Sequence, residues 1–133
     1  MKEAKFIKQF EIFLIKAKQD LMLVEQVINN ISVADEIKYF HLQQCVEKAI
    51  KSLLSSRGVS FPKTHDLEDL VELAEDNDIK LPEYIKILTT LNAYAVESRY
   101  AIILEHIYNV GTYLSHAKIF IEFIEALLKE NRF

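Results

Sequence analysis

Apolar residues recur along most of the chain at steps of three and four, which is the spacing of one face of an α-helix. In the N-terminal stretch, for example, Phe6, Phe10, Phe13 and Ala17 follow this spacing. Five helices are predicted in this way, over about residues 2–29, 33–57, 64–75, 82–97 and 113–129. Residues 99–110 fit either a further helix or an extended connection, because they are rich in β-branched and aromatic side chains.

Small polar residues and glycines mark where the predicted helices begin and end. Ser32 is the expected N-cap of the second helix, and Gly58 suits the position after its C-terminus. Thr64 is the expected N-cap of the short third helix, while Gly111 and Thr112 are expected to lead into the last one. Antiparallel helices joined by such short connections predict an up-and-down bundle.

Composition supports an all-α fold, an up-and-down bundle of four to five helices. The chain has 133 residues, which suits one domain over residues 1–133 with a substantial core. It contains only two glycines and two prolines. A β-rich domain needs many turn residues, and a mononucleotide-binding fold needs a glycine-rich loop, so both classes are excluded.

Charge, cysteine content and hydropathy narrow the function classes further. The net charge of −4 argues against a broad electrostatic grip on nucleic acid and leaves only a small basic cleft for that role. A single cysteine, Cys45, forms no internal disulfide and suits a reducing cytoplasm. No apolar run reaches the roughly 18 residues that cross a bilayer. The four scattered histidines follow no zinc-ligand spacing, so no metal site is expected. No association with a membrane and no cofactor are expected either.

Residues 39–74, YFHLQQCVEKAIKSLLSSRGVSFPKTHDLEDLVELA, resemble the signature of the HEPN domain, a small helical bundle named for nucleotide binding in prokaryotes and higher eukaryotes. The matching pieces are FHLQQCVEKAIKSLL on the second helix and PKTHDLEDL at the start of the third. The stretch YAVESRY at 94–100 is similar to a further landmark of the family, an arginine followed by a tyrosine. The resemblance implies a homodimer that often works beside a minimal nucleotidyltransferase in a toxin–antitoxin-like pair.

The same resemblance implies a second activity, because several branches of the family are metal-independent ribonucleases. Their motif is an arginine, four to six residues, a histidine and, in some members, a tyrosine two places further on that the partner enzyme can modify with AMP. Arg99, His106 and Tyr108 match this spacing. In that role His106 would move the proton of a 2′-hydroxyl, and Arg99 would stabilise charge on the phosphate. Alternatively, Arg99 pairs with a carboxylate such as Glu97 or Glu105, and His106 is a partly buried helix residue.

A polar stripe on the second helix is the candidate nucleotide site. Gln44, Glu47, Lys48 and Lys51 follow one another at steps that place them on one helix face. The resemblance implies that they line the nucleotide groove of the bundle, with Lys48 or Lys51 on a phosphate and Gln44 on a base or ribose. The alternative is a solvated helix face that carries a Glu47–Lys51 ion pair.

The other histidines and the cysteine favour structural roles. His65 is expected to bond back to its own loop beside Thr64, and His41 is expected to be packed or hydrogen-bonded rather than catalytic. His116 is expected to be exposed, and Cys45 is expected to be a small buried hydrophobe.

Two function hypotheses therefore remain, with a slight preference for the first. The first is a nucleotide-binding or interaction module whose activity belongs to a partner nucleotidyltransferase. The second is a metal-independent RNA endonuclease toxin that uses Arg99 and His106. Tyr100 favours the first, because many ribonuclease members have a small polar residue directly after the arginine. A purely structural homodimer without a ligand is the third and weakest hypothesis.

Overall fold

A computed structural model describes residues 8–95 and 108–130 of the chain. Within those two ranges all regular structure is helical, which confirms the prediction of an all-α bundle. The elements are α1 (Gln9–Val27), α2 (Asp35–Ser56), α3 (Leu67–Asp76), α4 (Ile85–Thr89), the 3-10 helix η2 (Thr90–Tyr94) and α6 (Val110–Glu130).

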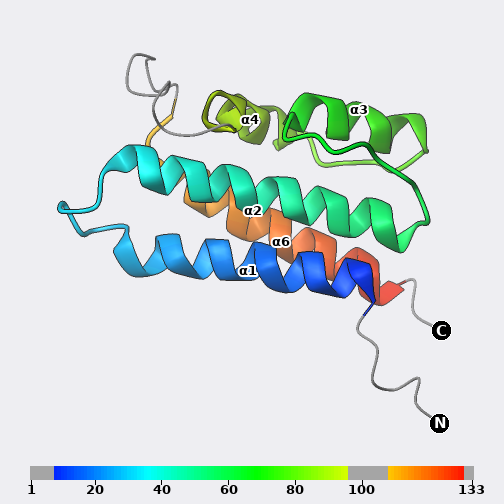
Figure 1. Ribbon diagram of the computed structural model, residues 1–133, viewed down its shortest axis with the longest axis horizontal. Coiled ribbons are helices and arrows are strands. Elements are labelled where there is room, and N and C mark those ends of the chain that lie inside the picture. The colour runs from blue at the N-terminus through cyan, green and yellow to red at the C-terminus, as the bar shows by residue number, and fades with distance from the viewer. Residues whose placement is uncertain (1–7, 96–107, 131–133) are drawn as a thin grey trace, which may run out of the picture.

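The long helix α2 lies at the centre of the bundle. Figure 1 shows α1, α2 and α6 running along the long axis of the molecule, with α3 and α4 on the side of α2 away from α1. α2 contacts α1, α6, α3 and η2. A helix with neighbours on so many sides is usually apolar all round, yet α2 buries polar side chains as well as apolar ones. Those buried on α2 are Lys38, Gln43, Glu47, Lys51 and Ser52.

One continuous core fills the space around α2. Its members come from every described helix, and the most deeply buried include Ala17, Val24, Leu42, Val46, Ile50, Leu53, Leu67, Leu88, Leu91, Ala117, Phe120 and Ile124. Burial of one such leucine, isoleucine or phenylalanine contributes about 1.5–3 kcal/mol. Cys45 belongs to this core, as predicted, and burial raises the pKa of its thiol.

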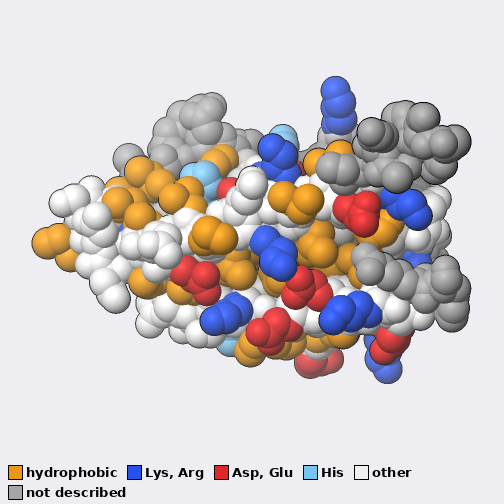
Figure 2. Space-filling view, turned by 90° about the horizontal axis from the view of Figure 1, so that it is seen from below, with side chains coloured by type: hydrophobic (Ala, Val, Ile, Leu, Met, Phe, Trp, Pro, Cys, Tyr) orange, Lys and Arg blue, Asp and Glu red, His pale blue; other side chains and the backbone are white. Residues whose placement is uncertain are grey.

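The face formed by α1 and α6 carries interleaved charges of both signs. Figure 2 shows lysine and arginine side chains alternating with aspartate and glutamate across this face. Two ion pairs join the helices here, Lys18 with Glu125 at 2.7 Å and Lys118 with Glu25 at 3.6 Å. None of the helices in the described ranges is long and apolar enough to span a membrane.

The predicted N-caps of α2 and α3 are wrong, and the helices begin slightly later. Ala34, not Ser32, occupies the N-cap position of α2, and Ser32 lies in the preceding turn, where its backbone N–H donates to the side chain of Asn30. At α3 the N-cap is Asp66 rather than Thr64. The Thr64 hydroxyl instead accepts a hydrogen bond from the Asp66 backbone N–H at 3.0 Å. Thr64 therefore stabilises the turn before the helix.

The helix predicted over 82–97 is broken within its described part. It is divided into α4 and η2, and the change to 3-10 geometry falls at Thr90. The Thr90 hydroxyl bonds to the Ile87 carbonyl at 2.6 Å and competes with the regular backbone pattern. Residues 96–97, like residues 2–7 of the first predicted helix, lie outside the described residues.

The other helix ends agree more closely with the prediction. Gly58 follows α2 with a positive φ of 70°, as expected of the residue after a helix C-terminus. α6 starts at Val110, so Gly111 and Thr112 lie inside its first turn rather than before it. The reason is Asn109, whose side-chain oxygen accepts a hydrogen bond from the Thr112 N–H at 2.8 Å and caps the helix.

Candidate functional site

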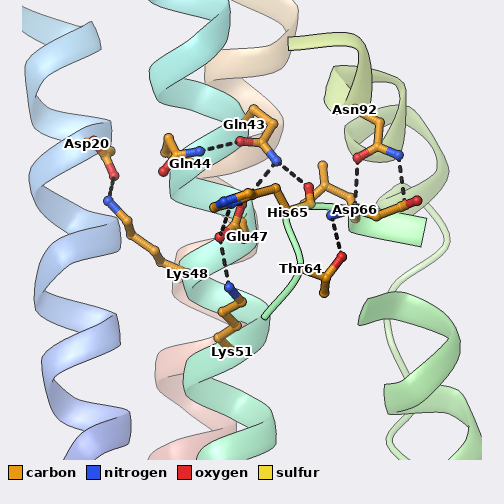
Figure 3. A network of polar contacts seen from close by, with 11 residues as sticks. Asp20, Gln43, Gln44, Glu47, Lys48, Lys51, Thr64, His65, Asp66 and Asn92 are labelled. Carbon is orange, nitrogen blue, oxygen red and sulfur yellow. Dashed lines mark hydrogen bonds and ion pairs between the residues drawn. The ribbon is translucent and has the colours of Figure 1, made fainter. Parts of the chain in front are cut away.

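Five consecutively stacked side chains of α2 form the candidate site, and we name them the α2 polar row: Gln43, Gln44, Glu47, Lys48 and Lys51. Figure 3 shows the row between α1 on one side and the loop that precedes α3 on the other. The helical repeat brings these residues together, since positions three and four apart share a face. Contacts with α1 and with the loop then divide the row into two clusters, each built around one carboxylate.

The first cluster is built around Glu47, whose side chain is almost completely buried. Only 3% of Glu47 is exposed. Its carboxylate lies 2.9 Å from the Lys51 Nζ and 3.0 Å from the His65 Nδ1, and it accepts a longer hydrogen bond of 3.3 Å from Gln43. Lys51 is buried too, with its Nζ 5.7 Å from the centre of the Phe61 ring. Three donors thus satisfy a carboxylate that water hardly reaches.

His65 joins this cluster from the loop before α3. Its backbone carbonyl accepts a hydrogen bond of 2.9 Å from the Gln43 side chain, and its ring bonds to Glu47. The expected bond of this histidine to its own loop is therefore wrong. Although Glu47 is buried, 61% of the His65 side chain is exposed. The ring thus connects a buried carboxylate to the molecular surface.

The second cluster is built around Asp20 of α1. The Asp20 carboxylate lies 2.7 Å from the Lys48 Nζ and 3.0 Å from the His41 Nδ1. Asp20 is largely buried, whereas 26% of the Lys48 side chain and 28% of the His41 side chain are exposed. The prediction that His41 is hydrogen-bonded is confirmed. A lysine ammonium has three N–H donors, and Asp20 uses one of those on Lys48.

Gln44 connects the two clusters. Its side-chain N–H donates to the Gln43 oxygen at 2.7 Å, which leaves the Gln44 oxygen free to accept. Of the four predicted nucleotide-binding residues, Gln44 and Lys48 are half-buried and reach the surface, while Glu47 and Lys51 are buried beneath it. The alternative interpretation of these residues is met in part: its Glu47–Lys51 ion pair forms, but both side chains are buried rather than part of a solvated face.

Asp66 and Asn92 hold the loop that carries His65. The Asn92 side chain accepts a hydrogen bond of 2.7 Å from the Leu67 backbone N–H and donates one of 2.8 Å to the Asp66 carboxylate. Asp66 also accepts hydrogen bonds from the N–H groups of Glu68 and Asp69. The hydrogen bond from Asn92, followed by those from the backbone, lowers the pKa of the Asp66 carboxyl. The start of α3 is thereby fixed next to the polar row.

A cluster of tyrosines lies at the other end of α2 and flanks the predicted catalytic segment. The Tyr94 ring stacks on Tyr39 with ring centres 4.8 Å apart, and the Tyr39 hydroxyl donates to the Tyr108 carbonyl at 3.0 Å. Burial raises the pKa of Tyr39 and of Tyr94 to about 12. Arg99 and His106 themselves lie outside the described residues. The described residues on either side of that segment, Tyr94 and Tyr108, therefore contact the same side chain, Tyr39.

The remaining predicted residues have simple surroundings. Tyr108, the predicted modification site, is 37% exposed, and its ring meets the edge of Tyr113 with centres 5.6 Å apart. His116 is half-buried rather than exposed, because its ring contacts Tyr84 and its Nδ1 bonds to the Thr112 carbonyl. No three histidine, cysteine, aspartate or glutamate side chains within 8–95 and 108–130 are grouped so that they could hold a metal ion.

Sequence reasoning missed Asp20, His41 and His65 as members of the site. One signal points to Asp20, since it lies three residues after Ala17 and four before Val24, within the apolar stripe of α1. A charged residue in such a stripe needs a partner from another helix. The sequence contains no comparable signal for His65, whose partner Glu47 is on a separate element.

The fold and the site define an all-α helical bundle whose central helix carries a buried polar row. A family model of the HEPN domain matches residues 10–129. The chain therefore belongs to the HEPN domain family. Searches of curated proteins and of solved structures find no match.

Proposed function

We propose that this HEPN domain is a nucleotide-binding and interaction module that acts with a minimal nucleotidyltransferase in a toxin–antitoxin-like pair. The observation that supports a nucleotide site is that the carboxylates in and beside the α2 polar row are buried beneath hydrogen-bond donors that reach the surface. The carboxylates of Asp20 and Glu47 are buried, the first bonded to two donors and the second to three. In contrast, Lys48, Gln44 and the imidazoles of His41 and His65 reach the surface. A surface of this kind favours an anionic ligand, because the negative groups lie behind the donors.

The residues of the row take different roles in this proposal. Lys48 binds a phosphate with the N–H groups that Asp20 does not use. Gln44 bonds to the base or the ribose with its side-chain oxygen or its second N–H, since Gln43 engages one of its two N–H donors. Glu47 and Lys51 are buried, and they support the row from beneath instead of reaching the ligand. Lys48 is thus the residue on which nucleotide affinity depends most.

The partners of the domain follow from its family. HEPN domains commonly dimerise, and a homodimer would double the nucleotide site. The nucleotidyltransferase partner would supply the chemistry that the polar row lacks, since the row holds ligand-binding groups but no evident nucleophile. Both partners are part of the proposal.

Calorimetric titration of the purified protein with AMP and with ATP tests nucleotide binding. Lys48→Met should weaken binding about tenfold or more, as expected for the loss of a charged hydrogen bond. The matched control is Lys86→Met, because Lys86 forms an exposed ion pair with Glu83 at 3.2 Å on another helix. Absence of nucleotide binding by the parent, or equal affinity of Lys48→Met, would contradict the proposed site.

A second candidate function is a metal-independent endoribonuclease that uses Arg99 and His106. The specific observation in its favour is the spacing of Arg99, His106 and Tyr108, which matches the motif of the ribonuclease branches of the family. In this reaction His106 takes the proton of the ribose 2′-hydroxyl, and the 2′-oxygen attacks the adjacent phosphorus. The bond from that phosphorus to the 5′-oxygen of the next nucleotide breaks. The products are a 2′,3′-cyclic phosphate and a 5′-hydroxyl, whose oxygen has taken up a proton. Arg99 stabilises the negative charge that grows on the phosphate oxygens.

Incubation of metal-free protein with mixed cellular RNA separates the two functions. Cleavage by the parent that is lost in a folded His106→Ala variant supports the ribonuclease. The ribonuclease function is contradicted if the parent and His106→Ala cleave equally, or if neither of them cleaves RNA. Tyr108 is tested separately by intact mass after coexpression with a minimal nucleotidyltransferase. A mass increase of one AMP that disappears in Tyr108→Phe supports modification there, and an unchanged parent mass argues against it.

A further inference from the structure

His65 is held at two points but faces outward. Its backbone carbonyl is bonded to Gln43, its Nδ1 is bonded to Glu47, and its side chain is the most exposed one in the Glu47 cluster. Figure 3 shows the ring reaching from the loop across the face of α2 that carries Gln44 and Lys48. The next residue, Asp66, is fixed in turn by its hydrogen bond with the Asn92 side chain.

The bond to Glu47 determines which ring nitrogen is free. An ionised carboxylate can only accept hydrogen bonds, so the His65 Nδ1 has to carry the proton in that contact. The other nitrogen, Nε2, is then the one that remains at the surface. It makes no hydrogen bond to any residue within 8–95 or 108–130. A protonated Nε2 donates, and an unprotonated one accepts.

The fold does not need this histidine to neutralise Glu47. Lys51 already supplies a buried positive charge at 2.9 Å, and Gln43 supplies a further donor. An exposed ring that serves no purpose would ordinarily keep its rotamer freedom, because ordering it costs entropy. Here the contact of Nδ1 with Glu47 fixes the ring, and the hydrogen bond from Gln43 to the backbone carbonyl fixes the loop that carries it. Side chains that are ordered before the ligand arrives are typical of binding sites, because binding then causes no further loss of their conformational entropy.

We infer that His65, with both ring nitrogens protonated, donates a hydrogen bond from Nε2 to the phosphate of the nucleotide, and that the buried Glu47 is the positioning residue that orients its ring. This inference rests on the proposed function, since it concerns the ligand of the same α2 polar row. The phosphate lies between Lys48 and His65, which reach it from α2 and from the loop. The ligand class is a phosphate-bearing nucleotide, and inorganic phosphate is the simplest probe of this part of the site.

The test is a pair of histidine-to-asparagine variants. His65→Asn places an amide nitrogen near the position of Nδ1, so it keeps a donor for Glu47 and removes only Nε2. His116→Asn is the matched control, because His116 also uses its Nδ1 in one hydrogen bond, but on α6. Affinities for AMP and for inorganic phosphate are measured for the parent, both variants and Lys48→Met. The side-chain nitrogen resonances of the parent histidines are followed in the same titration.

We expect His65→Asn to weaken AMP and phosphate binding about tenfold or more, with an unchanged unfolding midpoint, while His116→Asn binds as the parent does. We also expect the His65 Nε2 resonance to move on titration and the His116 resonances to stay. If Lys48→Met loses affinity while His65→Asn binds normally and the Nε2 resonance is still, the inference is overturned and the proposed function survives. If the parent binds neither probe, both are overturned. Should His65→Asn unfold, the parent's Nε2 resonance decides.

Discussion

Glu47 and Asp20 have the same kinds of partner but opposite surroundings. Each carboxylate is shared by one lysine and one histidine. At Glu47 the lysine is buried and the histidine is exposed, whereas at Asp20 both partners are partly exposed. The identity of the residues is therefore not what decides which group can reach a ligand.

The difference comes from what packs on either side of α2. The loop with Phe61 and His65 covers Lys51, and only the imidazole reaches the surface there. Asp20 lies at the contact between the antiparallel helices α1 and α2, and Lys48 is at the edge of that contact. Lys48 and Lys51 are three positions apart on one helix, yet one is available to a ligand and the other is a structural charge.

The largest effect is expected from breaking the Glu47 cluster. Glu47→Gln keeps the size of the side chain but leaves the buried Lys51 ammonium without its counter-charge. The free energy of unfolding should fall by about 3 kcal/mol or more, as for other buried pairs that lose one partner. Urea-induced unfolding at neutral pH measures it.

The double variant Glu47→Gln with Lys51→Met is the control for that prediction. It removes the uncompensated charge, so it should recover much of the lost stability. A single variant that loses less than about 1 kcal/mol would mean that water reaches Lys51, in contradiction to its burial.

A smaller loss of stability is expected when the carboxylate of the Asp20 cluster is replaced by an amide. Asp20→Asn leaves Lys48 and His41 without a carboxylate, but both side chains can be hydrated where they are. The loss should be about 1–2 kcal/mol, mostly from hydrogen bonds. The same unfolding experiment measures it. If Asp20→Asn destabilised the protein as much as Glu47→Gln does, the contrast between the clusters would be wrong.

Loosening the loop that carries His65 should cost about 1 kcal/mol. Asp66→Ala removes the N-cap of α3 and its link to Asn92. The pKa of Asp66 is lowered in the folded protein, so its stabilising effect is complete above the unfolded value near 4 and is lost as pH falls through the folded value. The stability difference between the parent and Asp66→Ala should therefore shrink in acid.

Asp66→Asn separates capping from charge in this experiment. Asparagine still accepts hydrogen bonds at an N-cap, so most of the stability should remain at neutral pH. It carries no titratable carboxyl, and its stability relative to Asp66→Ala should not change in acid. If the stability difference between the parent and Asp66→Ala stayed the same in acid, this would contradict the lowered pKa of Asp66.

The smallest change concerns the rate at which the Cys45 thiol is alkylated. Burial raises the pKa of this thiol, with a further contribution from the Asp20 carboxylate, so the folded protein should react very slowly. Labelling then occurs through unfolding, and Glu47→Gln should accelerate it more than Asp20→Asn. Mass spectrometry over time measures both rates. The reverse order would indicate a local opening at Asp20.

The sequence by itself determined the helices, the fold class and the family. The three- and four-residue apolar spacing is a local pattern, and it located α2, α3 and α6 to within a few residues at both ends. For α1 it located only the C-terminal end, because the helix was predicted from residue 2 and begins at Gln9. The scarcity of glycine and proline excluded β-rich folds, and the stretch over residues 39–74 carried the resemblance that the family match confirms. The Glu47–Lys51 pair was also predictable, because it depends on only one turn of helix.

Only the tertiary structure decided which polar groups are buried and with what they pair. Asp20 meets Lys48 from 28 positions away, and Glu47 meets His65 across 18. No local pattern specifies such contacts, because they depend on how α1 and the loop pack against α2. The same long-range packing placed Lys51 inside and Lys48 at the surface. Burial is a property of the assembled bundle, whereas helical periodicity is a property of the chain.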